Sequence, residues 1–254
     1  MIRPEFDGSK VRFTILLDCC SFCAIFGDMP KPKPIPAVKA LQRLIQGNRR
    51  FAKNRVTGLL SVHRDVRKLM LKSRGPFAII LSCSDSRAPS EILFDQGLGD
   101  LFVIRVAGNV VAPSLIGSIE FAAATTPARL VVVMGHTQCG AIQATLEVME
   151  GKKSQLAENI YDIVDRIQPH IQRLVSRKKG AYKREEILRD AVRANVLASA
   201  DHLRHGSRFL EDMVRRRELM IVGAEYDIQT GTVDFFDLPA AQKRPTTPKL
   251  RLSR

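Results

Sequence analysis

Thiol, imidazole, carboxylate and guanidinium groups gather in two short stretches of the 254-residue sequence, SCSDSR at 82–87 and GHTQCG at 135–140. The first stretch holds Cys83, Asp85 and Arg87 at alternate positions, and the second holds His136 and Cys139. Zinc prefers thiolate sulfur and imidazole nitrogen, and catalytic zinc sites use three protein ligands and leave one position open. Cys83, His136 and Cys139 supply that number of ligands.

Each stretch follows an apolar run, Phe77–Leu81 or Leu130–Met134, of the kind that forms a strand buried on both faces. In α/β proteins, active sites gather at the carboxyl ends of such strands. If the chain stays extended after the first run, Cys83, Asp85 and Arg87 share one side. Alone, a CxDxR pattern is more often an ion pair at a strand end, and an HxxC pattern is more often incidental. Their joint placement at two strand ends predicts a metal site.

The rest of the chain alternates strand-like and helix-like segments, which predicts an α/β fold with a mainly parallel four- to five-stranded sheet flanked by helices. Further strands are expected at 101–106, 219–224 and 232–236. Apolar residues at helical spacing predict helices at 37–53, 62–73, 89–94, 114–124 and 140–150, and a long helical region at 152–217.

We expect an N-terminal extension and Pro-rich linker at 1–35, a zinc-binding domain at 36–238 and a basic tail at 239–254. Residues 1–28 have the charged and apolar regions of an export signal, but Asp18 interrupts the apolar part. A start at Met29 is a further alternative. The extension also contains Cys19, Cys20 and Cys23, but its CxxC has no second CxxC to complete a zinc or redox motif.

Composition argues against several other classes of protein. The net charge of +14 would suit nucleic acid, but aromatic residues make up 6% and the basic residues are spread along helices and tails. No GxGxxG follows the first strand, so a dinucleotide-binding domain is set aside. No apolar stretch is long enough to span a membrane. Five cysteines, an odd number, favour a reducing, cytoplasmic setting, with periplasmic export as the alternative if residues 1–28 act as a signal.

Two blocks of the sequence resemble the β-class carbonic anhydrases: SCSDSRAPSEILFDQGLGDLFVIRVAGNVV at 82–111 and GSIEFAAATTPARLVVVMGHTQCGA at 117–141. Both blocks match in order and spacing, and a looser resemblance covers about 36–238. The resemblance implies one zinc per chain, held by Cys83, His136 and Cys139. It also implies that Asp85 and Arg87 form the family's catalytic dyad, in which Asp85 is either a fourth zinc ligand or turned toward Arg87.

The reaction implied by the resemblance is the reversible hydration of carbon dioxide to bicarbonate and a proton by zinc-bound hydroxide. Asp85 would orient that hydroxide, and Arg87 would hold Asp85. Val106, Ala107 and Gly108, at the end of the second strand, are the expected carbon dioxide slot, with Asn109 beside them. The resemblance further implies a homodimer or tetramer.

Two alternatives remain from the sequence. Relatives with the same zinc ligands hydrolyse carbon disulfide or carbonyl sulfide. The second alternative is a non-catalytic zinc-stabilised module in which Asp85 is permanently bound to the metal. Arg87 argues against this alternative, because a structural zinc site needs no residue that draws Asp85 away from the metal. The chain has no tryptophan, so it lacks the regulatory bicarbonate site, found in some relatives, that includes one.

Overall fold

The computed structural model describes residues 5–7, 10–12, 33–57, 75–152, 156–178 and 183–238. The chain divides into two units, Met1–Lys31 and Pro32–Arg254. In the first unit, β1 (Glu5–Asp7) pairs antiparallel with β2 (Lys10–Arg12). The helix expected at 62–73, the cysteines at 19, 20 and 23, and the tail from 239 lie outside the described residues.

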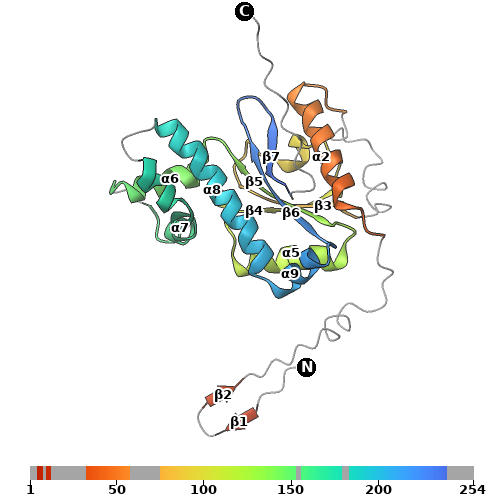
Figure 1. The fold of residues 1–254 in the computed structure, drawn as a ribbon, viewed down its shortest axis with the longest axis horizontal. Coiled ribbons are helices and arrows are strands. Elements are labelled where there is room, and N and C mark those ends of the chain that lie inside the picture. Colours follow the sequence, from red (N-terminus) through yellow and green to blue (C-terminus); the bar gives the residue numbers. More distant parts are fainter. Residues whose placement is uncertain are drawn as a thin grey trace, which may run out of the picture. The chain divides into compact units, whose positions relative to one another are not determined.

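The second unit is built on a five-stranded sheet with the order β4-β3-β5-β6-β7 (Figure 1). Its first four strands run parallel and the edge strand β7 is antiparallel to β6. The strands are β3 (Ala78–Ser82), β4 (Leu101–Arg105), β5 (Leu130–His136), β6 (Met220–Tyr226) and β7 (Val233–Asp237). This confirms the α/β fold with a mainly parallel sheet.

Helices follow the strands in the order expected for parallel crossovers. The helical region expected at 152–217 contains three helices within its described residues. The described helices of this unit are α2 (Ala37–Ala52), α4 (Ser90–Leu93), the 3₁₀ turn η1 (Ala107–Asn109), α5 (Pro113–Thr125), α6 (Gly140–Met149), α7 (Ile160–Lys178), α8 (Arg184–His205) and α9 (Arg208–Arg215). Within the described residues, no helix combines the length and apolar character needed to cross a membrane.

Alternate residues of β3 and β5 face opposite layers of helices, because side chains along a strand point to opposite faces. Ile79 and Leu81 pack with α5, α8 and α9, whereas Ala78 and Ile80 pack with α2 and α4. All residues of both strands are buried. The uninterrupted apolar runs in the sequence therefore reflect a sheet covered on both sides.

Strand register brings the two chemical stretches together. Ser82 of β3 pairs with Met134 of β5, so Cys83 and the last residues of β5 lie at the same edge of the sheet. The ladder between β5 and β6 continues to His136, which pairs with Tyr226. This pairing explains why β5 ends two residues later than its apolar run predicts.

Gly47 allows α2 to lie directly against the segment after α4. A Cβ atom at Gly47 would lie 1.7 Å from the backbone oxygen of Phe94, which cannot move without displacing the chain. We expect Gly47→Ala to lower the free energy of unfolding by about 3 kcal/mol, at the upper end of overpacking costs. Urea denaturation measures this change.

Gly117→Ala is the matched control. Gly117 lies in α5 with nothing within 4 Å of its added Cβ. That substitution should therefore raise stability by about 0.5–1 kcal/mol, as alanine does in helices. Equal effects of the two substitutions would contradict the packing seen at Gly47.

Candidate metal centre

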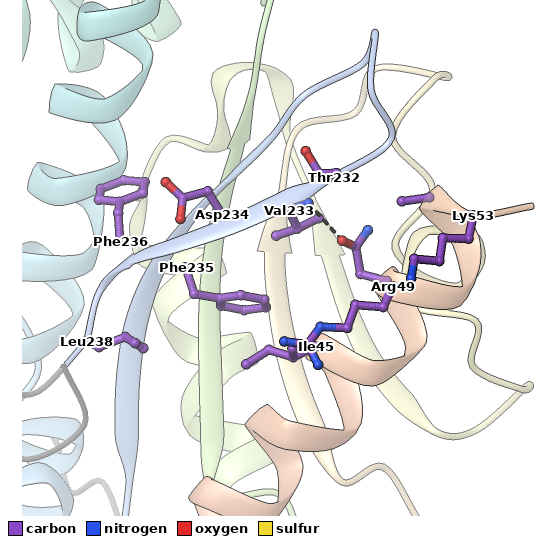
Figure 2. A pocket seen from close by; sticks show the side chains of 11 residues that line it. Ile45, Arg49, Lys53, Thr232, Val233, Asp234, Phe235, Phe236 and Leu238 are labelled. Carbon is purple, nitrogen blue, oxygen red and sulfur yellow. Dashed lines mark hydrogen bonds between the residues drawn. The ribbon is translucent and has the colours of Figure 1, made fainter. Parts of the chain in front are cut away.

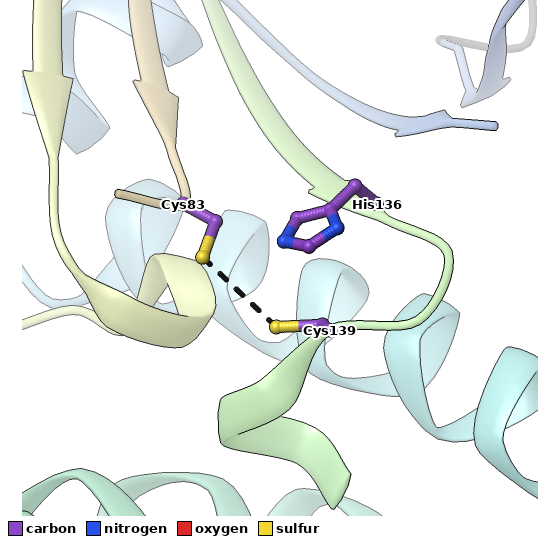
Figure 3. A group of neighbouring side chains, drawn as sticks. All are labelled: Cys83, His136 and Cys139. Carbon is purple, nitrogen blue, oxygen red and sulfur yellow. Dashed lines mark hydrogen bonds between the residues drawn. The ribbon is translucent and has the colours of Figure 1, made fainter. Parts of the chain in front are cut away.

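The three expected ligands converge from two strand ends (Figure 3). Cys83 directly follows β3, His136 ends β5, and Cys139 precedes α6. Their ligand atoms all lie within 4.8 Å of one another, and the two Sγ atoms are 4.0 Å apart. All three residues are buried. Cys83 is thus grouped with His136 and Cys139, which follow it by 53 and 56 positions in the sequence, as one potential ligand set.

The ring of His136 is oriented for metal binding. Its Nδ1 lies 2.9 Å from the backbone oxygen of Thr137, which can only accept, so Nδ1 carries the proton. The lone pair is therefore left on Nε2, a buried atom that has no hydrogen-bond partner among the described residues. An unpaired buried nitrogen facing two thiols is costly unless a cation completes it. This donor set fits zinc.

The local environment favours charge on Cys83. The hydrogen bond shared with Cys139, helped by the backbone N–H of Gly108 at 3.4 Å, lowers the pKa of Cys83. The same shared hydrogen bond, together with burial, raises the pKa of Cys139. In the absence of a cation the second thiol thus keeps its proton, and metal binding must release that proton.

Asp85 and Arg87 form an ion pair with two hydrogen bonds beside the triad of Cys83, His136 and Cys139. Arg87 Nε donates to Oδ1 of Asp85 at 2.9 Å, and Nη2 donates to Oδ2 at 2.8 Å. This pairing holds the pKa of Asp85 well below its usual range. Oδ2 also lies 3.9 Å from Nε2 of His136. The carboxylate is therefore next to the ligands while its oxygens point to the guanidinium.

The chain does not stay extended from Cys83 to Arg87. The prediction that Cys83, Asp85 and Arg87 share one side required an extended chain, so it does not apply here. A turn at Ser86–Arg87 follows Asp85, whose backbone oxygen accepts from Ala88. The turn lets the guanidinium of Arg87 fold back onto Asp85. Their proximity results from this turn rather than from strand alternation.

The expected substrate residues directly follow β4, just before η1 and within it. Val106 precedes η1, and Ala107 and Gly108 lie in it. Gly108 has a φ of 66°, and a Cβ there would lie 2.8 Å from Cδ1 of Ile167. Val106 and Ala107 are half-buried and apolar, while Gly108 is buried against Cys83.

Sequence reasoning missed Arg105, which donates hydrogen bonds to the backbone of the segment from Cys83 to Asp85. Its Nε donates to the Cys83 oxygen at 3.1 Å and its Nη2 donates to the Asp85 oxygen. The available signal was a charged residue at the end of the apolar run LFVIR. Such a charge is typical of any exposed strand end, so it did not stand out.

Two cavities lie elsewhere on the second unit. One, of about 620 Å³, lies between α2 and β7 and is lined by Ile45, Arg49 and Phe235, among others (Figure 2). Another, of about 1140 Å³, is lined by residues that include Arg129 and Leu219. Neither lining includes a member of the triad. Ligand chemistry rather than cavity size identifies the site.

A mainly parallel α/β sheet thus carries, at the carboxyl ends of two of its strands, a Cys–His–Cys set that could hold a metal ion. The carbonic anhydrase family profile matches residues 78–233. The chain is 35% identical over 208 residues to the carbonic anhydrase of Mycolicibacterium smegmatis, covering 81% of this chain and 95% of that one. It is 34% identical over 203 residues to carbonic anhydrase 2 of Mycobacterium tuberculosis, covering 80% and 93%. The chain belongs to the β-class carbonic anhydrase family.

Solved structures agree with this assignment. The β-carbonic anhydrase CcaA superposes with a TM-score of 0.61 at 26% identity, over 78% of this chain and 99% of that chain. A tetrameric β-carbonic anhydrase from Sordaria macrospora superposes with a TM-score of 0.62 at 18% identity, over 78% and 97%. The latter likeness concerns the fold alone.

Proposed function

We propose that this chain catalyses the reversible hydration of carbon dioxide to bicarbonate and a proton, with one zinc ion held by Cys83, His136 and Cys139. The observation that carries this proposal is the convergent ligand set, in which the unpaired Nε2 of His136 faces two thiols. Three protein ligands leave room for a further group, as in catalytic zinc sites. Family membership supports the same reaction.

Zinc held by Cys83, His136 and Cys139 would lower the pKa of a water molecule, so that hydroxide would be available near neutral pH. Asp85 acts as the hydrogen-bond acceptor that orients the nucleophile. Arg87 acts as the positioning partner of Asp85, since its fork fits both carboxylate oxygens. Because the pKa of Asp85 is held low, it stays ionised across the neutral and alkaline range.

We place the carbon dioxide slot at Val106, Ala107 and Gly108. Carbon dioxide carries no charge and needs little more than a small apolar surface near the nucleophile. The apolar side chains of Val106 and Ala107 are half-buried next to the loop that carries Cys83. Gly108 has no room for a side chain, which keeps this end of the slot narrow.

A stopped-flow assay of carbon dioxide hydration, with zinc measured on the same sample, tests this function. We expect about one zinc per chain and a rate that rises from mildly acid into alkaline pH. Since Asp85 is already ionised there, this rise reports acidification of the reacting water. Hydrolysis of carbon disulfide or carbonyl sulfide without carbon dioxide hydration would favour the first alternative. Stoichiometric zinc without any of these activities would favour the non-catalytic module.

We further infer that the chain forms a homodimer or tetramer. Several large apolar side chains are exposed on the second unit, including Val38 of α2, Phe121 of α5 and Leu197 of α8. Exposed apolar side chains mark subunit contacts where they form one contiguous patch, and these side chains are candidates for such a patch. Light scattering should show a mass of at least two chains, and a stable, active monomer would refute this assembly.

A further inference from the structure

Helix α8 reaches the metal centre through Asn195. This residue is buried, and its Nδ2 donates to the backbone oxygen of Gly108 at 2.8 Å. The N–H of the same glycine donates to Sγ of Cys83 at 3.4 Å. Gly108 is therefore held at both ends, by a thiol on one side and by a side chain of α8 on the other.

The orientation of the Asn195 amide follows from its partners. A carbonyl oxygen only accepts, so the amide atom that faces Gly108 must be Nδ2. Oδ1 then faces Nδ1 of His170 in α7, at 3.4 Å, and that nitrogen must be the donor. Helices α7 and α8 together thus fix the direction of the donor that holds Gly108.

The conformation of Gly108 makes this support useful. Its φ of 66° lies in the left-handed region, and a glycine, without a Cβ atom, has little steric resistance to leaving this conformation for another. A small rotation there would swing the N–H away from Cys83. Donated hydrogen bonds stabilise a thiolate and draw electron density from it, so the loss of one changes both the charge and the donor strength of the ligand.

We propose that Asn195 is a positioning residue of the metal centre, which keeps the N–H of Gly108 on the Cys83 thiolate. This inference rests on the proposed zinc site. Asn195 has no contact with the reacting atoms and acts through Gly108. Its effect should therefore appear in the metal–sulfur bond as well as in the rate.

Asn195→Leu tests the proposal, because leucine has a similar volume and no donor. The measurements are zinc affinity by chelator competition and the sulfur-to-metal charge-transfer band of the cobalt-substituted protein. We expect the zinc affinity to fall by about 10- to 100-fold, as is usual for outer-shell partners of metal ligands. The charge-transfer band should move to lower energy, because a thiolate that has lost a hydrogen bond gives up its electrons more readily.

Ser199→Ala is the matched control. Ser199 lies one turn further along α8, is equally buried, and donates to the backbone oxygen of Asn109 at 3.2 Å. The N–H of Asn109 donates to Val106 and not to a ligand. Both variants remove one buried hydrogen bond between α8 and η1, but only Asn195→Leu should change the cobalt band and the zinc affinity.

If folded Asn195→Leu keeps an unchanged cobalt charge-transfer band and an unchanged zinc affinity, the role of Asn195 is overturned but the proposed metal centre is not. An equal shift of the cobalt band in Ser199→Ala would have the same consequence. If Asn195→Leu does not fold, Asn195→Asp, which keeps the side-chain size but lacks the amide N–H, is measured in the same way. Failure of the unaltered protein to bind zinc or cobalt would instead overturn the metal centre, and with it this inference.

Discussion

Replacing His136 with alanine should remove zinc and lower carbon dioxide hydration by about 10³-fold or more, since the chemistry depends on the metal. His136 supplies the one neutral nitrogen of the ligand set, and no residue in the described part of the chain forms a hydrogen bond with its Nε2 that could replace a metal. Cys83→Ser and Cys139→Ser should have similar effects, because a serine hydroxyl is a poor zinc ligand at neutral pH. Metal analysis and stopped-flow rates on the same samples provide the test.

Cys23→Ser is the control for this series. Cys23 belongs to the N-terminal CxxC, which lies outside the described residues, whereas the proposed centre is built from Cys83, His136 and Cys139. Its replacement should leave both the zinc content and the rate unchanged. Full zinc occupancy in all three ligand variants, or zinc loss in Cys23→Ser, would show that the metal is bound elsewhere.

Arg87→Ala should keep its zinc and lose most of its activity, by about 10²-fold, which is the usual result of misplacing a catalytic group. In the structure both oxygens of Asp85 are bound to the guanidinium, and Oδ2 lies 3.9 Å from Nε2 of His136. Without the guanidinium of Arg87, the carboxylate of Asp85 is free to bind the metal at the fourth position, which the three protein ligands leave open. Cobalt spectra should then show an added oxygen ligand that persists at high pH.

Protonation does not explain this expected loss. Arg87 lowers the pKa of Asp85, so removing Arg87 lets that pKa rise toward about 3.9, the ordinary value. Asp85 would still be ionised at pH 7, and only its position would differ. Arg87→Lys should recover little activity, because an ammonium group cannot reproduce the planar fork.

Arg43→Ala is the matched control for Arg87→Ala. Arg43 is as exposed as Arg87, and it donates to a carboxylate oxygen of Asp100 at 2.8 Å, away from the centre. Its loss should leave the rate unchanged. Near wild-type activity of Arg87→Ala with full zinc, or cobalt spectra identical to those of the unaltered protein, would refute the proposed role of the pair.

The sequence alone was sufficient to predict the strands and the ligand types. The apolar runs at 77–81 and 130–134 predict buried strands because such runs are stable only when covered on both faces. Parallel strands end at the same edge, so the ligands could be expected to meet there. These features depend on local composition and periodicity, which can be read along the chain.

Tertiary structure alone decided how the site is supported. The register of Ser82 with Met134 depends on crossover packing, and the turn at Ser86–Arg87 replaces the extended chain that alternation would imply. Asn195 reaches Gly108 across 87 positions of sequence, and within a helical pattern it resembles any polar residue. Contacts between distant segments arise from the packing of whole helices and strands, and no local pattern encodes them.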